Sequence, residues 1–402
     1  MFAAARQRGP VQRVTLGDGH GAWVIVSYDL AREALNDPRF SKNMQAAFSS
    51  GTDVAEGLPG PALAKHMLAV DPPDHTRLRR LVSSAFTPRR VETLRPRVEA
   101  IVGGLLDGLA ASGPDEPVDL VSSFAFPLPF TVICELLGVD AEDRAELGHE
   151  LTTLLSPTPT DEAWARAKQA SDAVIGMLTA LVEQKHASPT DDLVSGLIEA
   201  RDEEGKLDHQ ELLATIFQLI VAGHDTTTSL IGNGVVALLA HPDQLAAFRA
   251  DESATDAAVE ELLRFDAPVP HATFRFAATD VEIGGVTIPK GDQVLVSLAA
   301  ANRDSAHFSS PDQLDLSRQG ERHLAFGHGI HFCLGAPLAR MEGRIALRSL
   351  FERFPGMQLA VAPDELHWGH GDGVVLRGLS ELPVRLGSDA LGERESGRGE
   401  HG

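Results

Sequence analysis

The 402-residue sequence has little cysteine and few aromatic residues, with 2 Cys, 1 Tyr and 3 Trp. Two cysteines cannot cross-link a chain of this length into a disulfide framework, so we expect a reducing compartment and a cytoplasmic location. Basic residues are in the minority too: 35 Lys and Arg stand against 57 Asp and Glu, which gives a net charge of −22. Because nucleic acids and anionic membrane surfaces are bound through concentrated Lys and Arg, this charge argues against both as partners.

The sequence also lacks a long apolar run. The nearest candidate, Ile216–Ala222, is far shorter than the ~20 residues that span a bilayer, and the N-terminal residues contain no apolar segment typical of a signal peptide. No membrane partner is therefore expected. The chain does contain 43% hydrophobic and 23% charged residues, a balance that excludes disorder for most of it and allows a large buried core.

Apolar residues recur at spacings of three and four along most of the chain, which predicts helices. These are expected at residues 76–86, 91–111, 126–137, 162–186, 208–240, 243–249, 255–265 and 334–354. Asp208 and Glu211 have the spacing of a capping box at the start of the longest one. Strand patterns are short, at residues 23–26, 281–288 with a turn at Gly284-Gly285, 293–297, 358–361 and 383–386. Helices and strands do not alternate regularly, so we expect a mainly α fold with small β-sheets (α+β) and not a doubly wound sheet.

The sequence contains no internal repeat and no interdomain linker, so residues 1–387 are expected to form a single large domain. The last segment, residues 388–402, is polar and rich in glycine, and we expect it to be a disordered tail. Two loops rich in Gly, Pro and Ser, residues 48–61 and 156–160, lie inside the domain. Long loops in compact domains often cover binding sites, so we expect these two to border a ligand.

The segment from Phe326 to Arg340, FGHGIHFCLGAPLAR, is the most informative part of the sequence. Its cysteine, Cys333, follows a glycine-rich loop and precedes a helical pattern with a proline in the first turn. A cysteine at a helix N-terminus faces free backbone N–H groups and the positive end of the helix dipole, which favours its thiolate. Glycines let the loop backbone approach a flat ligand closely. The segment therefore predicts a thiolate that either ligates a metal or attacks an electrophile.

The same segment resembles the haem-binding loop of the cytochrome P450 monooxygenases, in the pattern Phe326-Gly-x-Gly-x-His331-x-Cys333-x-Gly335. The resemblance implies haem b as cofactor, with Cys333 as the axial thiolate ligand of the iron. Phe326 would shield the sulfur, His331 would reach a haem propionate, and Gly335 belongs to the motif. It also implies a single cytochrome P450-type domain, with haem between a long distal helix and the helix that follows the cysteine loop.

The expected helix at residues 208–240 is the counterpart of that distal helix. Its middle reads AGHDTTT, in which glycine and threonine are poor helix formers. Ala222 and Gly223 would belong to a widened turn that makes room for dioxygen. Thr226 would hold oxygen and a water by hydrogen bonds, while Asp225 would help to bring protons in. From the residues alone, the alternative is a packing glycine and threonine hydroxyls bonded back to the preceding helical turn.

Glu261 and Arg264 lie three residues apart on one face of the helix expected at residues 255–265, where they can form an ion pair. From the residues alone, such a pair is most often an exposed salt bridge that contributes little to stability. In the family the Glu-x-x-Arg pattern belongs to a buried ion network near the cysteine loop, and Arg318 matches its third member. We expect these three residues to support the loop without reacting.

Cationic residues recur where the resemblance places the haem propionates. His75 and Arg79, in the run DPPDHTRLRR, match the family's third helix, and Arg275 matches a further propionate ligand. Carboxylates buried under a macrocycle need such charge-assisted donors. A second group of arginines would lie on the proximal face and receive an acidic ferredoxin, with ordinary surface charge as the alternative. Its members are Arg77, Arg80, Arg89, Arg90, Arg340, Arg344 and Arg348.

The resemblance implies an oxidoreductase that inserts one oxygen atom from O₂ into a large apolar small molecule, by hydroxylation or epoxidation. We expect a macrolide or another secondary metabolite as substrate, and electrons from NAD(P)H through a ferredoxin reductase and a ferredoxin. A hydroxylase of steroids, vitamin D-like compounds or xenobiotics is the alternative, and a haem-thiolate sensor without catalysis is a more distant one. We expect the protein to be a monomer.

A zinc hydrolase that uses His323, His328, His331 and Cys333 is disfavoured, because these residues crowd one short loop whereas zinc ligands converge from separate positions. The other cysteine, Cys134, lies in an apolar helical pattern and is expected to be a buried, inert thiol. Residues 2–8 resemble the end of the family's first helix, so we expect the usual lead-in segment to be missing.

Overall fold

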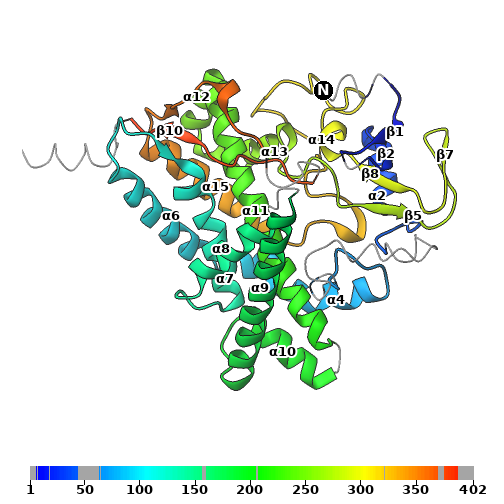
Figure 1. The fold of residues 1–402 in the computed structure, drawn as a ribbon. Helices are drawn as coiled ribbons and strands as arrows, with labels where there is room; N and C mark the ends of the chain where they lie inside the picture. The colour runs from blue at the N-terminus through cyan, green and yellow to red at the C-terminus, as the bar shows by residue number, and fades with distance from the viewer. Residues whose placement is uncertain are drawn as a thin grey trace, which may run out of the picture.

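The computed structural model describes residues 6, 8–17, 19–43, 63, 65–155, 160–204, 207–320, 322–369 and 375–387. Most of these residues are helical (Figure 1). The α-helices are α2 (Tyr28–Asn36), α4 (Asp74–Ser83), α5 (Pro88–Glu92), α6 (Arg95–Ala110), α7 (Pro127–Leu137), α8 (Arg144–Leu155), α9 (Asp161–Ala187), α10 (Leu193–Glu204), α11 (His209–Ala240), α12 (Pro242–Ala250), α13 (Thr255–Phe265), α14 (Leu298–Ala301) and α15 (Ala336–Arg353). A π-helical segment, η4 (Val121–Ala125), precedes α7.

The strands form three small sheets. The largest has the order β1-β2-β8-β5-β3, in which only β2 and β8 are parallel, with Ala22 opposite Gln293. Its strands are β1 (Val11–Thr15), β2 (Gly21–Ile25), β3 (Phe40–Ser41), β5 (Arg275–Ala277) and β8 (Gln293–Val296). The second sheet has the order β4-β10-β9 (Val118–Asp119, Pro383–Arg385 and Gln358–Leu359), and the third is the hairpin of β6 (Val281–Ile283) and β7 (Val286–Ile288).

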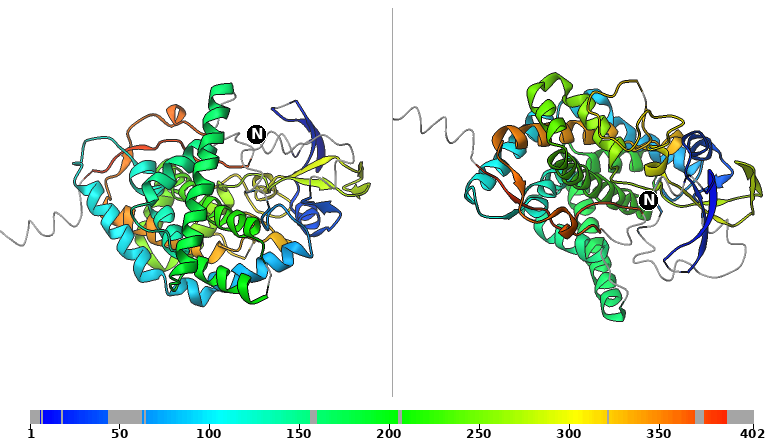
Figure 2. Two further views of the ribbon diagram at one scale, coloured as in Figure 1. Left: turned by 60° about the horizontal axis from the view of Figure 1, so that its bottom comes forward. Right: turned by 90° about the horizontal axis from the view of Figure 1, so that it is seen from above.

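Helix α11 crosses the middle of the helical part, and the views in Figures 1 and 2 show other helices around it. It packs against α7, α13 and α15. The capping box predicted from the sequence is present: the Asp208 carboxylate accepts the Glu211 N–H at 2.7 Å, and the Glu211 carboxylate accepts the Asp208 N–H at 3.0 Å. This reciprocal pair satisfies two backbone donors that a helix start leaves free, so a local signal is enough to define where α11 begins.

The buried apolar residues form two cores. The larger one joins the helices α6, α7, α9, α11, α13 and α15, with members such as Leu128, Ile231 and Leu347. The smaller one lies beneath the five-stranded sheet and includes residues of α2 and α14, such as Leu35 and Leu298. The sheet and its helices therefore form a side of the molecule distinct from the helical side, as Figure 1 shows at its right.

Most expected elements are present, and one helix is split. A continuous helix at residues 91–111 was expected, but α5 ends at Glu92 and α6 begins at Arg95. The cause is Pro96, which has no N–H to donate to the carbonyl of Glu92 and whose ring would clash with that carbonyl. The segments α2, α8 and α10 were not predicted as helices, and strand β1 was not predicted as a strand.

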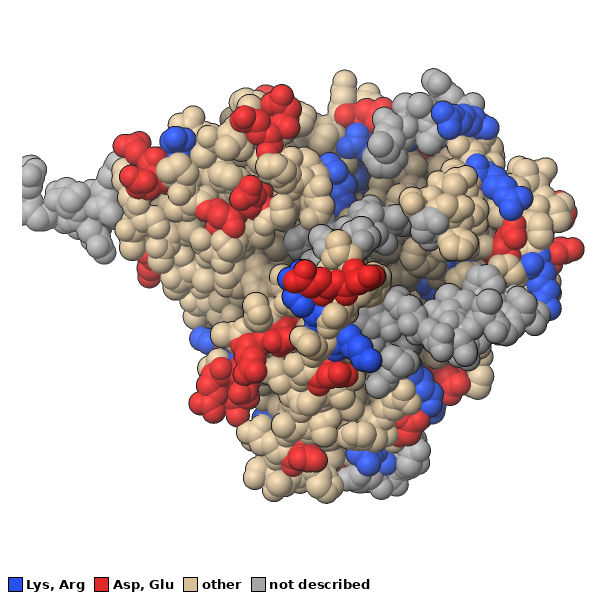
Figure 3. All heavy atoms as spheres, viewed as in Figure 1, with Lys and Arg blue, Asp and Glu red and all other residues tan. Residues whose placement is uncertain are grey.

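Several expectations concern residues outside the described ranges. These are the missing lead-in segment, most of the loop at residues 48–61, residues 156–159 of the second loop and the tail at residues 388–402. Within the described part of the chain, none of the helices is both long and apolar enough to cross a membrane. On the face seen in Figure 3, Asp and Glu side chains gather mainly over the helical side at the left, while Lys and Arg toward the right are interspersed with acidic residues.

Candidate active site

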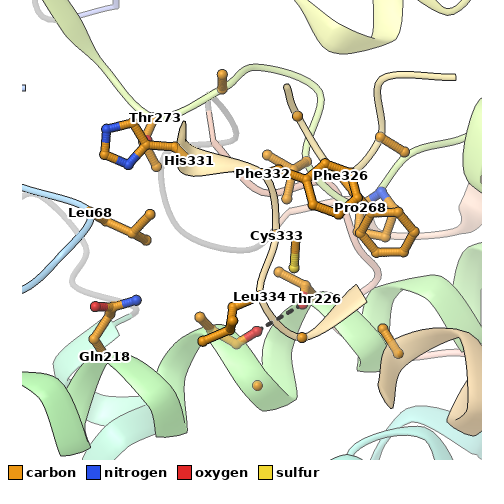
Figure 4. Close-up of a pocket in the computed structure, with 18 of the residues that line it drawn as sticks. Leu68, Gln218, Thr226, Pro268, Thr273, Phe326, His331, Phe332, Cys333 and Leu334 are labelled. Atoms are coloured by element: carbon orange, nitrogen blue, oxygen red, sulfur yellow. Dashed lines mark hydrogen bonds between the residues drawn. The ribbon is translucent and has the colours of Figure 1, made fainter. Parts of the chain in front are cut away.

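A cavity of about 1400 Å³, part of it open to solvent, lies between the two cores. Apolar residues from both sides line it, among them Leu35 and Leu298 from the sheet side and Leu230, Leu263 and Leu338 from the helical side. The cysteine loop runs along one side of this cavity and α11 runs along the other (Figure 4). The cavity therefore brings together segments that are more than 100 residues apart in the sequence.

The loop that carries Cys333 depends on its glycines. Gly327 and Gly329 both have φ of +73°, a conformation that side chains with a Cβ rarely adopt. A Cβ on Gly329 would also lie 2.8 Å from the backbone oxygen of Leu35, so no larger residue fits without movement of the backbone. The Cys333 N–H donates to the Phe326 oxygen at 2.9 Å, which closes the loop just before α15.

Cys333 lies deep within the molecule but is exposed to the cavity that it borders. Burial raises the pKa of its thiol, although backbone N–H groups of Gly335 and Ala336 and the charges of Arg79 and Arg340 act in the opposite direction. The backbone N–H groups at the start of α15 thus lower the pKa of this thiol in the direction expected from the sequence, but desolvation by the surrounding protein outweighs them. A bound metal ion deprotonates a coordinating thiol, so a thiolate here depends on the metal.

Five basic side chains gather at one side of the cavity. His75, Arg79, Arg275 and His331 line it, as expected for the first group of cationic residues, and the charge of the buried Lys42 acts on His331. The rings of His75 and His331 are 4.4 Å apart, and His75 Nε2 and His331 Nδ1 are buried without a hydrogen-bond partner among the described residues. Burial and the nearby cations lower the pKa of His331 to about 3, and burial lowers that of Arg275 to about 10. Buried cationic groups of this kind favour the binding of an anion.

Lys42 is a member of this cluster that sequence reasoning missed. Its Nζ donates to the Thr273 oxygen at 2.7 Å and to the Phe274 oxygen at 3.0 Å, directly before Arg275. Burial, together with the charge of Arg275, lowers the pKa of Lys42 well below its usual value. Only Asp71, whose carboxylate accepts the Lys42 N–H, contributes an opposing charge. Nothing in the local pattern of Phe40-Ser41-Lys42 signals that this lysine is buried.

On α11, Ala222, Gly223 and Thr226 line the cavity, as expected. The expected widened turn is not present, because α11 is α-helical throughout and the Thr226 hydroxyl donates to the Ala222 oxygen at 2.9 Å. A Cβ on Gly223 would come within 2.9 Å of the Ile133 side chain on α7. The helix thus shows the packing glycine and the back-bonded hydroxyl of the alternative interpretation, and both belong to residues that face the cavity.

Asp225 is placed differently from its neighbour. It is buried and is not among the described residues that line the cavity. Its carboxylate lies 3.0 Å from His224 Nε2, and the other ring nitrogen of His224 contacts the Ile220 oxygen at 2.7 Å. The rings of Phe126 and Phe130 pack edge-on against this histidine. The described structure therefore directs one carboxylate oxygen of Asp225 to His224 and not to the cavity.

A second carboxyl group, Glu342, lines the cavity and was not predicted. It is buried on α15, and burial raises its pKa to about 8, partly offset by a hydrogen bond with Thr227. Its Oε2 has no hydrogen-bond partner within the described part of the chain. The signal was present in the sequence: Glu342 lies four residues after Leu338 and three before Ile345, so it interrupts the apolar face of its helix.

The Glu261 network is buried, so the alternative of an exposed salt bridge is wrong. Arg264 donates to both carboxylate oxygens of Glu261 at 2.7 Å, and its guanidinium also donates to the Asn302 oxygen at 2.9 Å. Arg318 donates to Glu261 at 3.1 Å. The network ties α13 to the chain that leads into the cysteine loop, which is the supporting role expected from the sequence.

The arginines of the second group differ in their surroundings. Arg77 donates to both oxygens of Glu211 and is bound to the start of α11. Arg340, Arg344 and Arg348 each form an ion pair with a carboxylate, whereas Arg80 and Arg89 are exposed and no described side chain pairs with them. The paired arginines therefore have structural partners within the chain, and Arg80 and Arg89 retain free charges.

These features fit a haem group. The free thiol of Cys333 provides an iron ligand, and the basic cluster, with its unpartnered His75 Nε2 and His331 Nδ1, suits two propionates. Apolar side chains line the rest of the cavity, as a macrocycle requires. Among the described residues there is no cluster of three or more His, Cys, Asp or Glu that could hold a metal ion, and the zinc hydrolase alternative therefore fails.

Known proteins with similar sequences and structures show to which family this chain belongs. A model of the family "Cytochrome P450" matches residues 1–365. The chain is 46% identical to 6-deoxyerythronolide B hydroxylase of Saccharopolyspora erythraea, over 96% of this chain and 95% of that protein. It is also 46% identical to vitamin D(3) 25-hydroxylase of Pseudonocardia autotrophica, over 96% and 93% of the two chains. The tirandamycin C-bound P450 monooxygenase TamI has a TM-score of 0.86 and 43% identity, with 96% of each chain covered.

The chain belongs to the cytochrome P450 family. It is a monooxygenase and an oxidoreductase with the mainly helical fold expected from the sequence, and the family's haem iron is its cofactor. A small molecule and O₂ are its substrates. Cys134 is buried as expected, and burial raises the pKa of its thiol to about 12.

Proposed function

We propose that this protein hydroxylates or epoxidises a large apolar small molecule, with a macrolide-like secondary metabolite as the first class to test. The observation that carries the proposal is the composition of the cavity: the free thiol of Cys333, the hydroxyl of Thr226 on α11 and a basic cluster, within a mainly apolar lining. Residues 1–387 act as one domain in this proposal. A monomer is sufficient, because all the residues it uses lie on one chain.

The cofactor in this proposal is haem b. Cys333 would ligate the iron, Phe326 would cover the sulfur, and His75, Arg79 and Arg275 would bind the propionates. His331, whose Nδ1 has no described partner, would join them. The bound haem supplies the activation of dioxygen that no side chain of the protein can provide.

Thr226 and Asp225 control protons in this proposal. The Thr226 hydroxyl borders the cavity and can exchange its bond with the Ala222 oxygen for a bond to a water molecule or to bound oxygen. Asp225 lies one residue earlier, buried against His224, and it can supply protons to this region when that contact opens. Gly223 lines the cavity beside Thr226, and the absence of a Cβ there lets the Ile133 side chain pack against it.

The proposed substrate class follows from the size and lining of the cavity. Apolar residues such as Met67, Leu219, Val269 and Ala272 border it, so apolar surface of the substrate would be removed from water. One relative is named as a hydroxylase of 6-deoxyerythronolide B and another as a hydroxylase of vitamin D(3). These names support macrolide-like substrates first and vitamin D-like or steroid substrates as the alternative.

Electrons in this proposal come from NAD(P)H through a ferredoxin reductase and an acidic ferredoxin. Arg80 and Arg89 support this, because they are exposed and without described partners. Arg80 directly follows Arg79, which donates to the Phe332 oxygen next to Cys333 at 2.7 Å. A negatively charged protein that docks on these arginines would therefore lie close to the cysteine loop.

The test of the function begins with the absorption spectrum of the reduced, carbon monoxide-bound protein. A strongly red-shifted Soret band is expected from the wild type and should be lost in Cys333→Ser, with loss of turnover. Cys134→Ser is the matched control, because that buried thiol lies outside the cavity. A panel of macrolides, polyketide aglycones, sterols and fatty acids then tests the substrate class by substrate-induced Soret shifts and turnover. Shifts with fatty acids alone would overturn the macrolide assignment.

A further inference from the structure

Glu260 joins the start of the cysteine-loop helix to α13. Its Oε1 accepts the Arg340 Nε–H at 2.6 Å and its Oε2 accepts the Nη2–H of the same guanidinium at 2.9 Å. His323 Nδ1 accepts the Ala325 N–H at 3.1 Å, so the proton of the neutral ring lies on Nε2, which faces Glu260 Oε2 at 3.1 Å. The carboxylate therefore holds two cationic or donor groups at once.

Arg340 connects this carboxylate with the surroundings of Cys333. Its guanidinium carbon lies 4.5 Å from the centre of the Phe326 ring, and the Phe326 oxygen accepts the N–H of Cys333. Arg340 follows Cys333 by seven residues and lies near the start of α15, which begins at Ala336. It is also one of the two arginines whose charge acts on the thiol of Cys333.

The charge of Glu260 persists over the whole physiological range. Burial opposes ionisation, but the bonds from Arg340 and His323 outweigh it and lower the pKa of Glu260 to about 2. The pair is only partly buried, with 33% of the Arg340 side chain and 40% of the Glu260 side chain exposed. Solvent screens part of the electric field of this ion pair. The field that remains at the Cys333 sulfur depends on whether the charges of Arg340 and Glu260 cancel.

We propose that Glu260 is a positioning residue that fixes Arg340 against Phe326 and balances its charge, and thereby sets the reduction potential of the iron ligated by Cys333. The inference rests on the proposed function, because it requires a haem at Cys333. A positive charge near the sulfur withdraws electron density from the ligand and favours the reduced iron. When Glu260 neutralises this charge, the thiolate donates more electron density to the iron than it would beside an unbalanced arginine.

The test is the reduction potential of the haem-loaded variants, measured by spectroscopic titration. Glu260→Gln leaves the Arg340 charge unbalanced and should shift the potential to more positive values. Arg340→Gln removes that charge while Glu260 remains, and should shift it in the opposite direction. The double variant Glu260→Gln/Arg340→Gln should return close to the wild-type value. Glu260→Asp and Arg340→Lys keep both charges and should leave the potential close to the wild-type value, which separates the effect of charge from that of side-chain shape.

The matched control is the ion pair of Arg344 with Asp256, one turn further along α15 and 2.7 Å long. Asp256→Asn and Arg344→Gln should leave the potential within the error of the wild type, because Asp256 is exposed and neither residue contacts the cysteine loop. Shifts of equal sign in both Glu260 and Arg340 variants, or shifts no larger than in the controls, would overturn the proposal. Absence of the red-shifted carbon monoxide band from the wild-type protein would instead overturn the proposed function.

Discussion

Residues of opposite charge type are buried at different sides of the same cavity. At one side, basic groups lie together with hardly any acid; at the other, the carboxyl group of Glu342 is buried and its pKa is raised to about 8. A burial-raised pKa means that folding takes up a proton near neutral pH, since in the unfolded chain this carboxyl group has its usual pKa of 4.5. Glu342 should therefore make stability depend on pH.

Between about pH 4.5 and 8 the folded state keeps the Glu342 proton and the unfolded state does not, so rising pH favours unfolding. The free energy of unfolding should fall by up to about 1.4 kcal/mol per pH unit in this window relative to Glu342→Gln, which retains a bond to Thr227. Urea unfolding of both proteins at several pH values measures the difference. A difference that does not change with pH would show that Glu342 is ionised in the folded state.

Gly329 allows a second test at the residue scale. Gly329→Ala combines an unfavourable φ of +73° with a contact of 2.8 Å to the Leu35 oxygen, and we expect a loss of more than about 1–2 kcal/mol and weakened haem retention. Gly285→Ala is the control, because its φ of +80° carries the same conformational cost but its Cβ would meet nothing within 4 Å. Equal losses in both variants would mean that the contact with Leu35 contributes nothing.

At the scale of elements, the parts that could be predicted from sequence are those defined by local signals. The capping box begins α11, the apolar period defines α13, and Gly284-Gly285 turns the β6–β7 hairpin. Lys42 and the pairing of Asp225 with His224 could not be predicted, because both depend on contacts between segments distant in sequence or on rotamers. Cys333 and the pair of Glu261 and Arg264 could be predicted, because each belongs to a short motif of neighbouring residues.

The network of α13 gives a prediction at this scale. Arg264→Met leaves the buried Glu261 without its bidentate partner and frees carbonyl groups such as that of Asn302. Breaking a buried pair from one side costs roughly 3–5 kcal/mol, which should be visible in urea unfolding together with loss of haem. Arg97→Met is the control: it removes an exposed bidentate pair with Glu135 and should cost less than about 1 kcal/mol. Similar losses would contradict the supporting role of the network.

At the scale of the whole molecule, the net charge of −22 makes the exposed Arg80 and Arg89, with which no described side chain pairs, unusual. Charge reversal of Arg89 to Glu should slow ferredoxin-driven turnover several-fold at low salt, with a smaller effect at high salt, because exposed charges act mainly on association rates. Turnover driven by peroxide needs no partner and should be unchanged. The same reversal at Arg344, already paired with Asp256, should have the weaker effect. Equal loss in both assays would indicate a structural role for Arg89.

The basic cluster between the two cores has a consequence for how the protein is made in the cell. The cationic members of this cluster, among them the buried Lys42 and Arg275, repel one another with Asp71 as the opposing charge, and they remain poorly solvated until a further anion joins them. A chain that has not received its cofactor therefore holds its sheet side and its helical side together less firmly, and ligand binding adds stability by mass action. Cofactor supply then acts as a checkpoint on maturation: newly made chains that miss it are the ones that proteases remove first.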